Sequence, residues 1–344
     1  MKTYLLPSEG CFYKANLHCH TNYSDGKKTP AEIKEIYQRL GYSIVAFTDH
    51  DVLIPHDELT DAHFLALHGV EVELTEGVEI PGPYRKTCHI CLIGLEPENI
   101  TQPCWHRTLY QTRYYYGNAK NHVDEVRFDE SEPDFEREYT PSCVNRVLQT
   151  AREKGFFVTY NHPTWSLETY ADYMQYEGMH AFEIMNGGAL TEGFDDYNPR
   201  VFDDFLRGGK RLYCIGADDN HNARPEEDRH WDAGVAFTMI KATSLDYRTV
   251  TRALEAGHFY ASEGPEIFEL YYEDGRAYVK CSAADRIICT YGSRKGSVRY
   301  AYEAPLSEAD FEIPADCIYF RITVIDAKGY HACTNAYFVD DLTQ

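Results

Sequence analysis

The fold is constrained most by a series of short apolar runs that alternate with helical segments through roughly the first 220 residues. Residues 29–40 predict a helix, because Thr29 suits the N-cap, Pro30 suits the first helical position and Glu32 completes a capping box. Residues 43–48 follow as a near-continuous apolar run, which is typical of a buried parallel strand. The runs expected to be strands are residues 13–20, 43–48, 70–74, 89–95, 156–160, 181–185 and 212–216. About seven strands interleaved with helices predict an α/β fold with a parallel-rich barrel.

Two parts of the chain depart from this alternation. Residues 101–139 carry aromatic and acidic clusters without clear periodicity, and we expect a long insertion that acts as a lid or a surface loop. From residue 258 the pattern changes to period two, with turn signals at Asp274-Gly275 and later in the tail. The sequence therefore predicts a barrel over residues 1–257 and a small β-sandwich-like domain over residues 258–344.

Composition excludes several classes of protein. No run of about 18 apolar residues is present and the N-terminus lacks the apolar stretch of a signal peptide, so we expect no membrane span and a cytoplasmic location. Several of the 11 cysteines, such as Cys91 and Cys214, lie in apolar runs, the setting of small buried thiols, which fits a reducing compartment. The formal net charge of −22 disfavours long nucleic acids as partners, because it repels a polyanion.

Histidines and carboxylates recur where the predicted strands end. A single H-x-H or D-x-H motif would carry little weight, but parallel barrels build their active sites at this edge. Alternation along a strand places His18 and His20 on one face, and it does the same for Glu71 and Glu73. The candidate ligands are His18, His20, Asp25, His50, Glu71 or Glu73, His89, His162, Asp218 or Asp219, and His221. Side chains of these types at one edge predict a metal centre.

The donor types indicate which metals would bind. Mixed imidazole and carboxylate donors suit Zn²⁺, Mn²⁺ or Fe²⁺, whereas Mg²⁺ and Ca²⁺ prefer sites built from oxygen alone. The candidates exceed the roughly four ligands of one tetrahedral ion, so we expect two or three divalent ions that share a bridging carboxylate. Water that bridges two cations loses a proton near neutral pH and can attack phosphorus or a carbonyl carbon. The pattern therefore predicts a hydrolase that needs no Ser or Cys nucleophile.

The order of these motifs resembles that of a known family. Over roughly residues 14–240 the chain is similar to the PHP (polymerase and histidinol phosphatase) family of metal-dependent phosphoesterases, in the motifs NLHCHTNYSDG, FTDHD, GVEVE, His89, NHP and ADDNH. The resemblance implies a distorted seven-stranded β/α barrel. It also implies three ion positions, the first held by His18, His20, Glu71 and Asp219, the second by Glu71, His89 and His162, and the third by Asp25, His50 and His221. The residues with implied catalytic roles are Glu71, Asp219 and His20.

The resemblance also bears on the two open alternatives. Glu71 follows a glycine and a valine as the bridging glutamate of the family follows its glycine, which favours Glu71 over Glu73. A shift of the strand by one pleat would exchange them. Asp219 stands two residues before His221, which favours Asp219 over Asp218.

Other residues near the motifs are expected to support the site. Asp49 is expected to orient a ligand histidine, and Glu183 and Asn186 could contact substrate or brace the fold. A phosphate group would need cationic partners. The loop residues expected to bind substrate are Arg85, Arg113 and Arg224. The only histidines of the tail, His258 and His331, are expected to stay outside the metal site.

The sequence thus predicts a multinuclear metal hydrolase that acts on a small phosphate ester or a short oligonucleotide. The segment ALEAGHFYASEGPE and the all-β tail are similar to the carbaryl-hydrolase-like branch of the family, which keeps a metal-dependent ester, amide or carbamate hydrolase as an alternative. A third alternative is a non-catalytic module whose metals brace the barrel while the β domain binds a carbohydrate or a partner. The complete ligand set argues against this module, because degenerate modules lose ligands.

Overall fold

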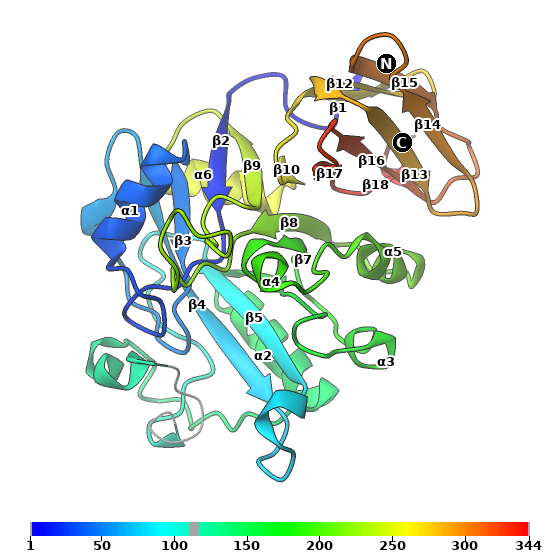
Figure 1. The fold of residues 1–344 in the computed structure, drawn as a ribbon. Coiled ribbons are helices and arrows are strands. Elements are labelled where there is room, and N and C mark those ends of the chain that lie inside the picture. The colour runs from blue at the N-terminus through cyan, green and yellow to red at the C-terminus, as the bar shows by residue number, and fades with distance from the viewer. Residues whose placement is uncertain (1, 110–116, 343–344) are drawn as a thin grey trace.

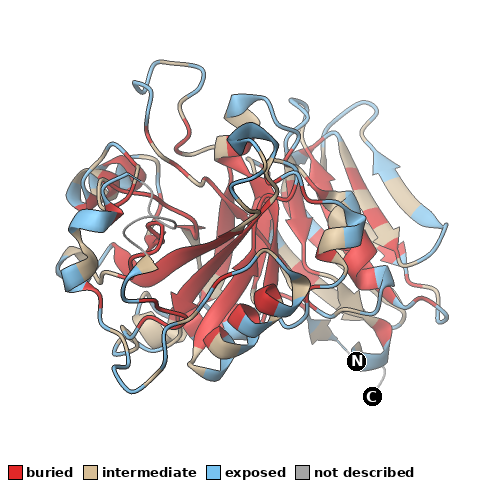
Figure 2. Cartoon of the chain, turned by 90° about the horizontal axis from the view of Figure 1, so that it is seen from below, coloured by how far each residue is buried: buried red, intermediate tan, exposed pale blue. Residues whose placement is uncertain are grey.

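The computed structural model describes residues 2–109 and 117–342, and its largest element is a long sheet. The strands follow one another in the order β14-β13-β16-β17-β10-β9-β2-β3-β4-β5-β6-β7-β8, and β18 pairs with β16. The strands nearest the predicted ligands are β2 (Cys11–Asn16), β3 (Ile44–Phe47), β4 (Leu65–Thr75), β5 (Thr87–Gly94), β6 (Phe156–Tyr160), β7 (Ala181–Asn186) and β8 (Tyr213–Ala217). Strands β3 to β8 are almost wholly buried, as their near-continuous apolar sequences predict (Figure 2).

The neighbouring strands from β2 to β8 are parallel except around β5, which runs antiparallel to both β4 and β6. Strands β4 and β5 form a hairpin because residues 76–86 between them are too few for a crossover helix. Beyond the ends of β2 and β8, Cys19 and Asn220 form a parallel bridge, and the His20 N–H donates to the Asn220 carbonyl oxygen at 3.1 Å. The two ends of this series of strands therefore meet where the ligand loops begin.

The helices begin where local sequence favours them. Helix α1 (Pro30–Arg39) carries the predicted capping box, in which the Thr29 side chain accepts from the Glu32 N–H and the Glu32 side chain accepts from the Thr29 N–H. Helix α2 (Pro141–Glu153) begins after Thr140, whose side chain accepts a hydrogen bond from the first turn. The other helices are α3 (Tyr170–Tyr173), α4 (Gly187–Glu192), α5 (Pro199–Arg207), α6 (Tyr247–Glu255) and α7 (Val339–Leu342), with 3₁₀ turns η1 (Asp57–Leu59), η2 (Gly82–Tyr84), η4 (Ala119–Asn121) and η5 (Val123–Glu125). Among the described residues, no helix has both the length and the apolar character needed to cross a bilayer.

The C-terminal region is rich in strands, as predicted (Figure 1, upper right). The long sheet enters it through β9 (Phe237–Ala242), β10 (Phe259–Ser262), β17 (His331–Thr334), β16 (Tyr319–Ile325), β13 (Arg286–Tyr291) and β14 (Gly296–Tyr300), with β18 (Tyr337–Phe338) on β16. A second sheet has the order β1 (Thr3–Tyr4), β11 (Ile267–Glu273), β12 (Arg276–Ala284) and β15 (Leu306–Glu312). The N-terminal strand β1 therefore belongs to the sheet that the C-terminal region builds.

One apolar core extends across the predicted boundary at residue 257. Tyr37 and Phe47, from the first part of the chain, belong to the same buried cluster as Ile267, Leu270 and Phe320. Side chains packed in one core stabilise one another, because each removes apolar surface of the others from water. The division into a barrel over 1–257 and a β domain over 258–344 stays a prediction, and the packing joins the two regions closely.

Candidate metal centre

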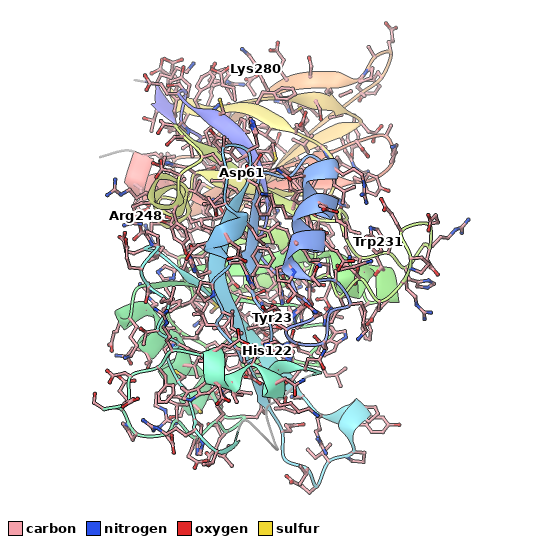
Figure 3. The ribbon with its side chains drawn as sticks, turned by 90° about the vertical axis from the view of Figure 1, so that its left-hand side faces the viewer. Tyr23, Asp61, His122, Trp231, Arg248 and Lys280 are labelled. Carbon is pink, nitrogen blue, oxygen red and sulfur yellow. The ribbon has the colours of Figure 1, made fainter. Side chains whose placement is uncertain are left out.

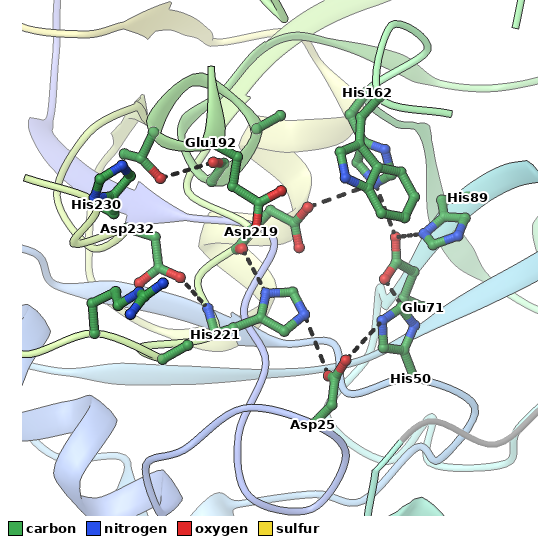
Figure 4. Close-up of a pocket in the computed structure, with 16 residues that line it drawn as sticks. Asp25, His50, Glu71, His89, His162, Glu192, Asp219, His221, His230 and Asp232 are labelled. Carbon is green, nitrogen blue, oxygen red and sulfur yellow. Dashed lines mark hydrogen bonds and ion pairs between the residues drawn. The ribbon is translucent and has the colours of Figure 1, made fainter. Parts of the chain in front are cut away.

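The side chains predicted from the strand ends converge in one place. Figure 4 shows those that line the pocket, Asp25, His50, Glu71, His89, His162, Asp219 and His221. The converging side chains come from the loop after β2 (His18, His20, Asp25), because β2 ends at Asn16 and not at the predicted residue 20, the turn after β3 (His50), β4 (Glu71), β5 (His89), the turn after β6 (His162) and the turn after β8 (Asp219, His221). Their donor atoms form overlapping groups within 4.8 Å: His20, Asp25, His50 and His221; His18, His20, Glu71 and Asp219; His18, His162 and Glu183; and His50, Glu71 and His89. The parallel strands bring their carboxyl ends to one edge, and the antiparallel β5 brings its beginning, with His89, to the same edge.

Glu71 lies at the middle of the cluster. Its Oε1 lies 3.1 Å from His18 Nε2, 2.9 Å from His89 Nδ1 and 3.4 Å from His162 Nε2. Its Oε2 lies 3.2 Å from His20 Nε2 and 3.1 Å from His50 Nδ1. Glu73 lies farther out, with an oxygen 3.8 Å from His89 Nε2 and the other accepting from a threonine hydroxyl. The geometry therefore places Glu71, and not Glu73, between the histidines.

Asp219 and Asp218 point to different places. Asp219 Oδ1 lies 2.9 Å from His20 Nε2 and 3.2 Å from His18 Nε2. Its backbone φ of +51° is in the left-handed region, a conformation that few non-glycine residues adopt and that is common at functional sites. Asp218 instead accepts hydrogen bonds from three successive backbone N–H groups at residues 234–236 and from the Tyr37 hydroxyl. Asp219 thus faces the cluster, while Asp218 fixes a loop behind it.

Asp25 and His221 complete the more open side of the cluster. His221 Nε2 lies 3.3 Å from Asp25 Oδ1, and the nearest nitrogens of His50 and His20 each lie 4.0 Å from an Asp25 oxygen. The His221 backbone N–H donates to Asp232 at 2.7 Å, which fixes this turn. The Asp25 and His221 side chains are partly exposed, whereas those of His20 and His50 are buried.

Glu183 braces the cluster from behind, a role that the sequence left open between substrate contact and structure. Glu183 Oε1 accepts from His18 Nδ1 at 3.0 Å, which turns His18 Nε2 toward Glu71 and Asp219. Glu183 Oε2 accepts from the His162 backbone N–H at 3.1 Å and from Asn186 Nδ2 at 2.8 Å. A carboxylate on the far nitrogen fixes the orientation of a metal-binding imidazole and raises its basicity. The signal that the sequence offers is a single acidic residue, Glu183, inside the apolar run of β7 (Ala181–Asn186).

The expectation that Asp49 orients a ligand histidine is wrong. Its Oδ1 accepts from the backbone N–H groups of Thr21 and Ser24, at 2.8 Å and 3.1 Å, and from the Ser24 hydroxyl at 2.6 Å. Its Oδ2 accepts from the Thr21 hydroxyl at 2.7 Å. Asp49 therefore shapes the loop that leads to Asp25, and sequence could not show this because the two segments meet only in the fold.

Burial and opposite charges shift the ionisation of the cluster in characteristic directions. Burial would raise the pKa of the Glu71 carboxyl, but the surrounding imidazoles, His18 first, hold it well below its usual range. The pKa of Asp219 is lowered in the same way, against its burial, by His18 and His20. Burial lowers the pKa of His50 to about 3. For His162 the effect of burial is outweighed by the hydrogen bond to Glu71 and the charge of Asp219, which raise its pKa to about 9.

A pocket of about 460 Å³ opens onto the cluster. Beyond the predicted ligands, its lining includes Trp165, Glu192, Arg224, His230 and Asp232. Its mixture of charges and one large aromatic ring suits a small polar molecule with a planar or apolar part.

The three predicted substrate arginines have different positions. Arg224 lines the pocket, as expected of a residue that contacts substrate. Arg85 donates to the carbonyl oxygens of Ile80 and Val78 in its own loop and is not among the lining residues. Arg113 lies outside the described residues.

The tail histidines stay outside these groups among the described residues, as predicted. His331 Nδ1 lies 3.0 Å from Glu263 Oε2, and its ring stacks on that of Tyr197 with centroids 4.2 Å apart. His258 is half-buried, and burial lowers its pKa. His331 therefore serves packing between the tail and the segment before α5.

The PHP domain family model matches residues 16–313. A stretch of 67 residues, 20% of this chain, is 37% identical to a protein named 5′-3′ exoribonuclease from Haemophilus influenzae, and it covers only 23% of that relative.

Two solved structures are similar at low identity. A two-domain protein from Bacteroides vulgatus, described as containing a predicted PHP-like metal-dependent phosphoesterase, matches with a TM-score of 0.45 and 14% identity over 96% of this chain and 98% of that one. A putative metal-dependent phosphoesterase from Bifidobacterium adolescentis matches with a TM-score of 0.37 and 17% identity over 65% of this chain and 91% of that one.

Proposed function

This chain belongs to the PHP domain family, and from that premise we propose that it is a metal-dependent hydrolase of small phosphate esters or short oligonucleotides. The observation that carries the proposal is the position of Glu71, whose two oxygens lie among the nitrogens of five histidines. A carboxylate in this position can serve two cations at once. A cluster kept only for structure would not need an open pocket beside it, and this one has such a pocket.

The donor set fits divalent ions. His20 Nδ1 and His89 Nε2 are buried without a hydrogen-bond partner among the described residues, and the contacts of Glu71 Oε2 and Asp219 Oδ1 are with other candidate ligands. Buried polar atoms without partners are costly, and such atoms beside gathered carboxylates and imidazoles are typical of a cation site. We infer that two or three ions of Zn²⁺, Mn²⁺ or Fe²⁺ bind, with Glu71 shared between them. The ligands would be His18, His20, Asp25, His50, Glu71, His89, His162, Asp219 and His221.

We also infer that strands β2 to β8 close into the distorted seven-stranded barrel that the sequence predicts. The bridge between Cys19 and Asn220 supports this closure, because it joins the segments after the first and last strands. A closed ring would hold the ligand loops on one rim at fixed distances.

Different residues would bind the ions and the substrate around the reacting phosphate. Bound divalent ions would activate water and neutralise charge on the phosphate oxygens. Glu71 and Asp219, both held ionised, would keep the ions in place, and His20 stands between them. Arg224 would contact the phosphate from the pocket wall, where its guanidinium can offer two parallel donors. Trp165 would contact the organic part of the substrate.

The size and charge of the molecule favour small substrates over long nucleic acids. The pocket of about 460 Å³ lies within the usual range for small-molecule sites. The net charge of −22 repels a long polyanion. Inside the pocket, the local electric field of bound cations would outweigh this repulsion for a small ester.

A side-by-side hydrolysis assay at physiological salt tests the proposal. The substrates are a chromogenic phosphate ester, short oligonucleotides, long single strands and aryl esters, each with and without a chelator. We expect chelator-sensitive hydrolysis of the phosphate ester or of the short oligonucleotides. Chelator-sensitive cleavage of the aryl esters alone would favour the carbonyl alternative, and efficient degradation of long strands would refute the charge argument.

A further inference from the structure

The insertion at residues 101–139 holds the turn that follows His50. The Gln102 side chain, almost fully buried, accepts from the Leu53 N–H and donates to the Asp51 carbonyl oxygen, both at 2.7 Å. The Arg137 guanidinium, 2% exposed, donates to the Asp51 carboxylate. Asp51 adopts a φ of +61°, in the left-handed region that few non-glycine residues occupy. The hydrogen bonds from the insertion therefore stabilise an uncommon backbone conformation.

The same insertion also holds the loop that precedes Asp25. The Asn118 N–H donates to the Ser24 carbonyl oxygen at 2.6 Å, and the Asn118 side chain donates to the Asn22 carbonyl oxygen at 3.2 Å. The His122 ring stacks on the Tyr23 ring with centroids 4.1 Å apart, and both are seen on the same side of the molecule in Figure 3. Loop 21–26 is therefore fastened by the insertion from outside.

A small apolar core joins the two contacts into one body. Val52, beside the His50 turn, packs with Trp105, Ala119 and Val126 of the insertion. All four side chains are at most 8% exposed. A packed core of this kind transmits displacement between the segments that it joins, because protein interiors yield little.

The other ligands are braced by different elements. Glu183 and Asn186, from β7, hold His18, the His162 backbone and Asp219, and Asp232 holds the turn of His221. Among the described residues, the insertion thus contacts the candidate ligands' loops mainly beside Asp25 and His50. One further hydrogen bond, of 3.4 Å, runs from Arg137 to the Glu73 carbonyl oxygen.

We propose that the insertion is a positioning element for one ion of the cluster, the one between Asp25, His50 and His221. This inference rests on the proposed function, because it assumes that divalent ions bind. Asp25 and His50 come from separate loops. To share an ion, their donor atoms must be held to within a fraction of an ångström of the required geometry. The insertion contacts the turn after His50 and the loop before Asp25, and its small apolar core fixes the distance between them. Its residues act through Asp25 and His50 and do not touch the ion.

The test measures metal binding and not activity. Two variants are compared with wild type by calorimetric titration of the chelator-treated full chain with Mn²⁺ or Zn²⁺, and by metal content after equilibration. The double variant Arg137→Met/Asp51→Asn removes the buried pair without leaving a lone charge. His122→Ala removes a partly exposed ring and keeps all buried charges. The matched control is Arg321→Met/Asp203→Asn, a buried pair that joins β16 to α5 away from the site.

We expect both insertion variants to weaken one metal-binding step 10- to 100-fold. At limiting metal they should lose about one ion per chain, and the control should bind metal as wild type does. Wild-type isotherms in both insertion variants would overturn the inference and leave the proposed function standing. If the double variant does not fold, the isotherm of His122→Ala decides. A wild-type chain that binds no divalent ion would overturn both the inference and the proposed function.

Discussion

Glu71 shows how much one residue can determine at this site. Its carboxylate lies within 3.4 Å of nitrogens from five histidines, and the surrounding imidazoles, His18 first, hold its pKa well below its usual range although it is buried. The neighbouring acid on the same strand face, Glu73, has no comparable surroundings. Two similar residues separated by one pleat therefore have different expected roles, and this difference can be measured.

Replacing Glu71 by Ala should remove more than one divalent ion per chain and reduce hydrolysis by several orders of magnitude, because one carboxylate is expected to serve two cations. Glu73→Ala is the matched control and should keep most of its metal. Metal content by mass spectrometry and the rate with a phosphate ester check this. Loss of metal in Glu73→Ala with retention in Glu71→Ala would refute the assignment.

Metal binding should strengthen as pH rises toward about 9. His162 has a pKa of about 9 in the metal-free fold, above its ordinary value of 6.5, so it holds a proton at neutral pH that a metal must displace. Below pH 9, the apparent affinity for the metal should fall about tenfold for each pH unit of acidification, because one proton must be displaced from His162. Titrations at pH 6.5, 7.5 and 8.5 with buffered free metal measure the slope. An affinity that is flat over this window would contradict the shift.

The same shift predicts the opposite trend for the stability of the metal-free protein. A raised histidine pKa contributes stability that is fully present below pH 6.5 and is lost as pH rises through about 9. The contribution of His162 is on the order of 3 kcal/mol. Urea unfolding in the presence of a chelator should therefore show a falling free energy of unfolding across this window. His162→Ala should reduce that fall, and the raised pKa values of His18 and His20 should keep the rest of it.

Residue patterns predicted which side chains gather but not what holds them. The placement of H-x-H and D-x-H where predicted strands end made His18, His20, Asp219 and His221 candidate ligands, because strand ends can be recognised from the local pattern. The bond from Glu183 to His18 joins residues 165 positions apart, and no local pattern encodes it. The sequence could therefore predict which side chains gather, while the supporting hydrogen bonds depend on the folded arrangement.

At the scale of single elements, helix ends were the most predictable feature. The capping box at Thr29 depends on residues within one turn, so the sequence contains all of it. Strand direction was less predictable. The predicted strands 70–74 and 89–95 left room for a crossover, whereas β4 and β5 extend toward each other and leave only residues 76–86, so that β5 runs antiparallel. Strand β4 also begins at Leu65, earlier than the predicted residue 70, because its first residues are buried on both faces and show no alternation.

Replacing Thr29 by Ala should lower the free energy of unfolding by about 1 kcal/mol. The change removes the Thr29 hydroxyl, which accepts from the Glu32 N–H at 3.3 Å and donates to the Glu32 carboxylate at 2.9 Å, while the bond from the Thr29 backbone N–H can persist. Thr29→Ser keeps the hydroxyl and serves as the control, with a change close to zero. Denaturant unfolding of the metal-free proteins measures both. An equal loss in the two variants would show that the Thr methyl group, and not the cap, stabilises the helix.

At the scale of the whole molecule, the C-terminal strands and the first part of the chain share their interior. The guanidinium of Arg321 on β16 makes two hydrogen bonds, of 3.0 Å and 2.9 Å, with the Asp203 carboxylate on α5. The pair is almost fully buried. The sequence change at residue 258 therefore marks a change of strand pattern, whereas the core continues across it.

We expect the full chain to unfold in one cooperative transition, because the shared core and the Arg321–Asp203 pair couple the two regions. Arg321→Ala should lower stability by roughly 3 kcal/mol, because it removes the buried guanidinium and leaves the Asp203 carboxylate with the Tyr319 hydroxyl at 3.0 Å and the more distant Arg207 at 3.7 Å. Urea unfolding followed by circular dichroism and by tyrosine and tryptophan fluorescence checks this. Two separate transitions, with Arg321→Ala affecting neither, would show that the regions fold independently.

The central claim is that this cluster binds divalent ions and uses them to hydrolyse a phosphate ester. The most direct measurement strips the full chain with a chelator, adds back Mn²⁺ or Zn²⁺ in steps, and follows metal bound and phosphate ester hydrolysed in the same samples, with Glu71→Ala in parallel. We predict that activity is absent without metal, rises with the second or third ion bound, and stays absent in Glu71→Ala. Hydrolysis by the stripped protein, or equal hydrolysis by Glu71→Ala, would contradict the account.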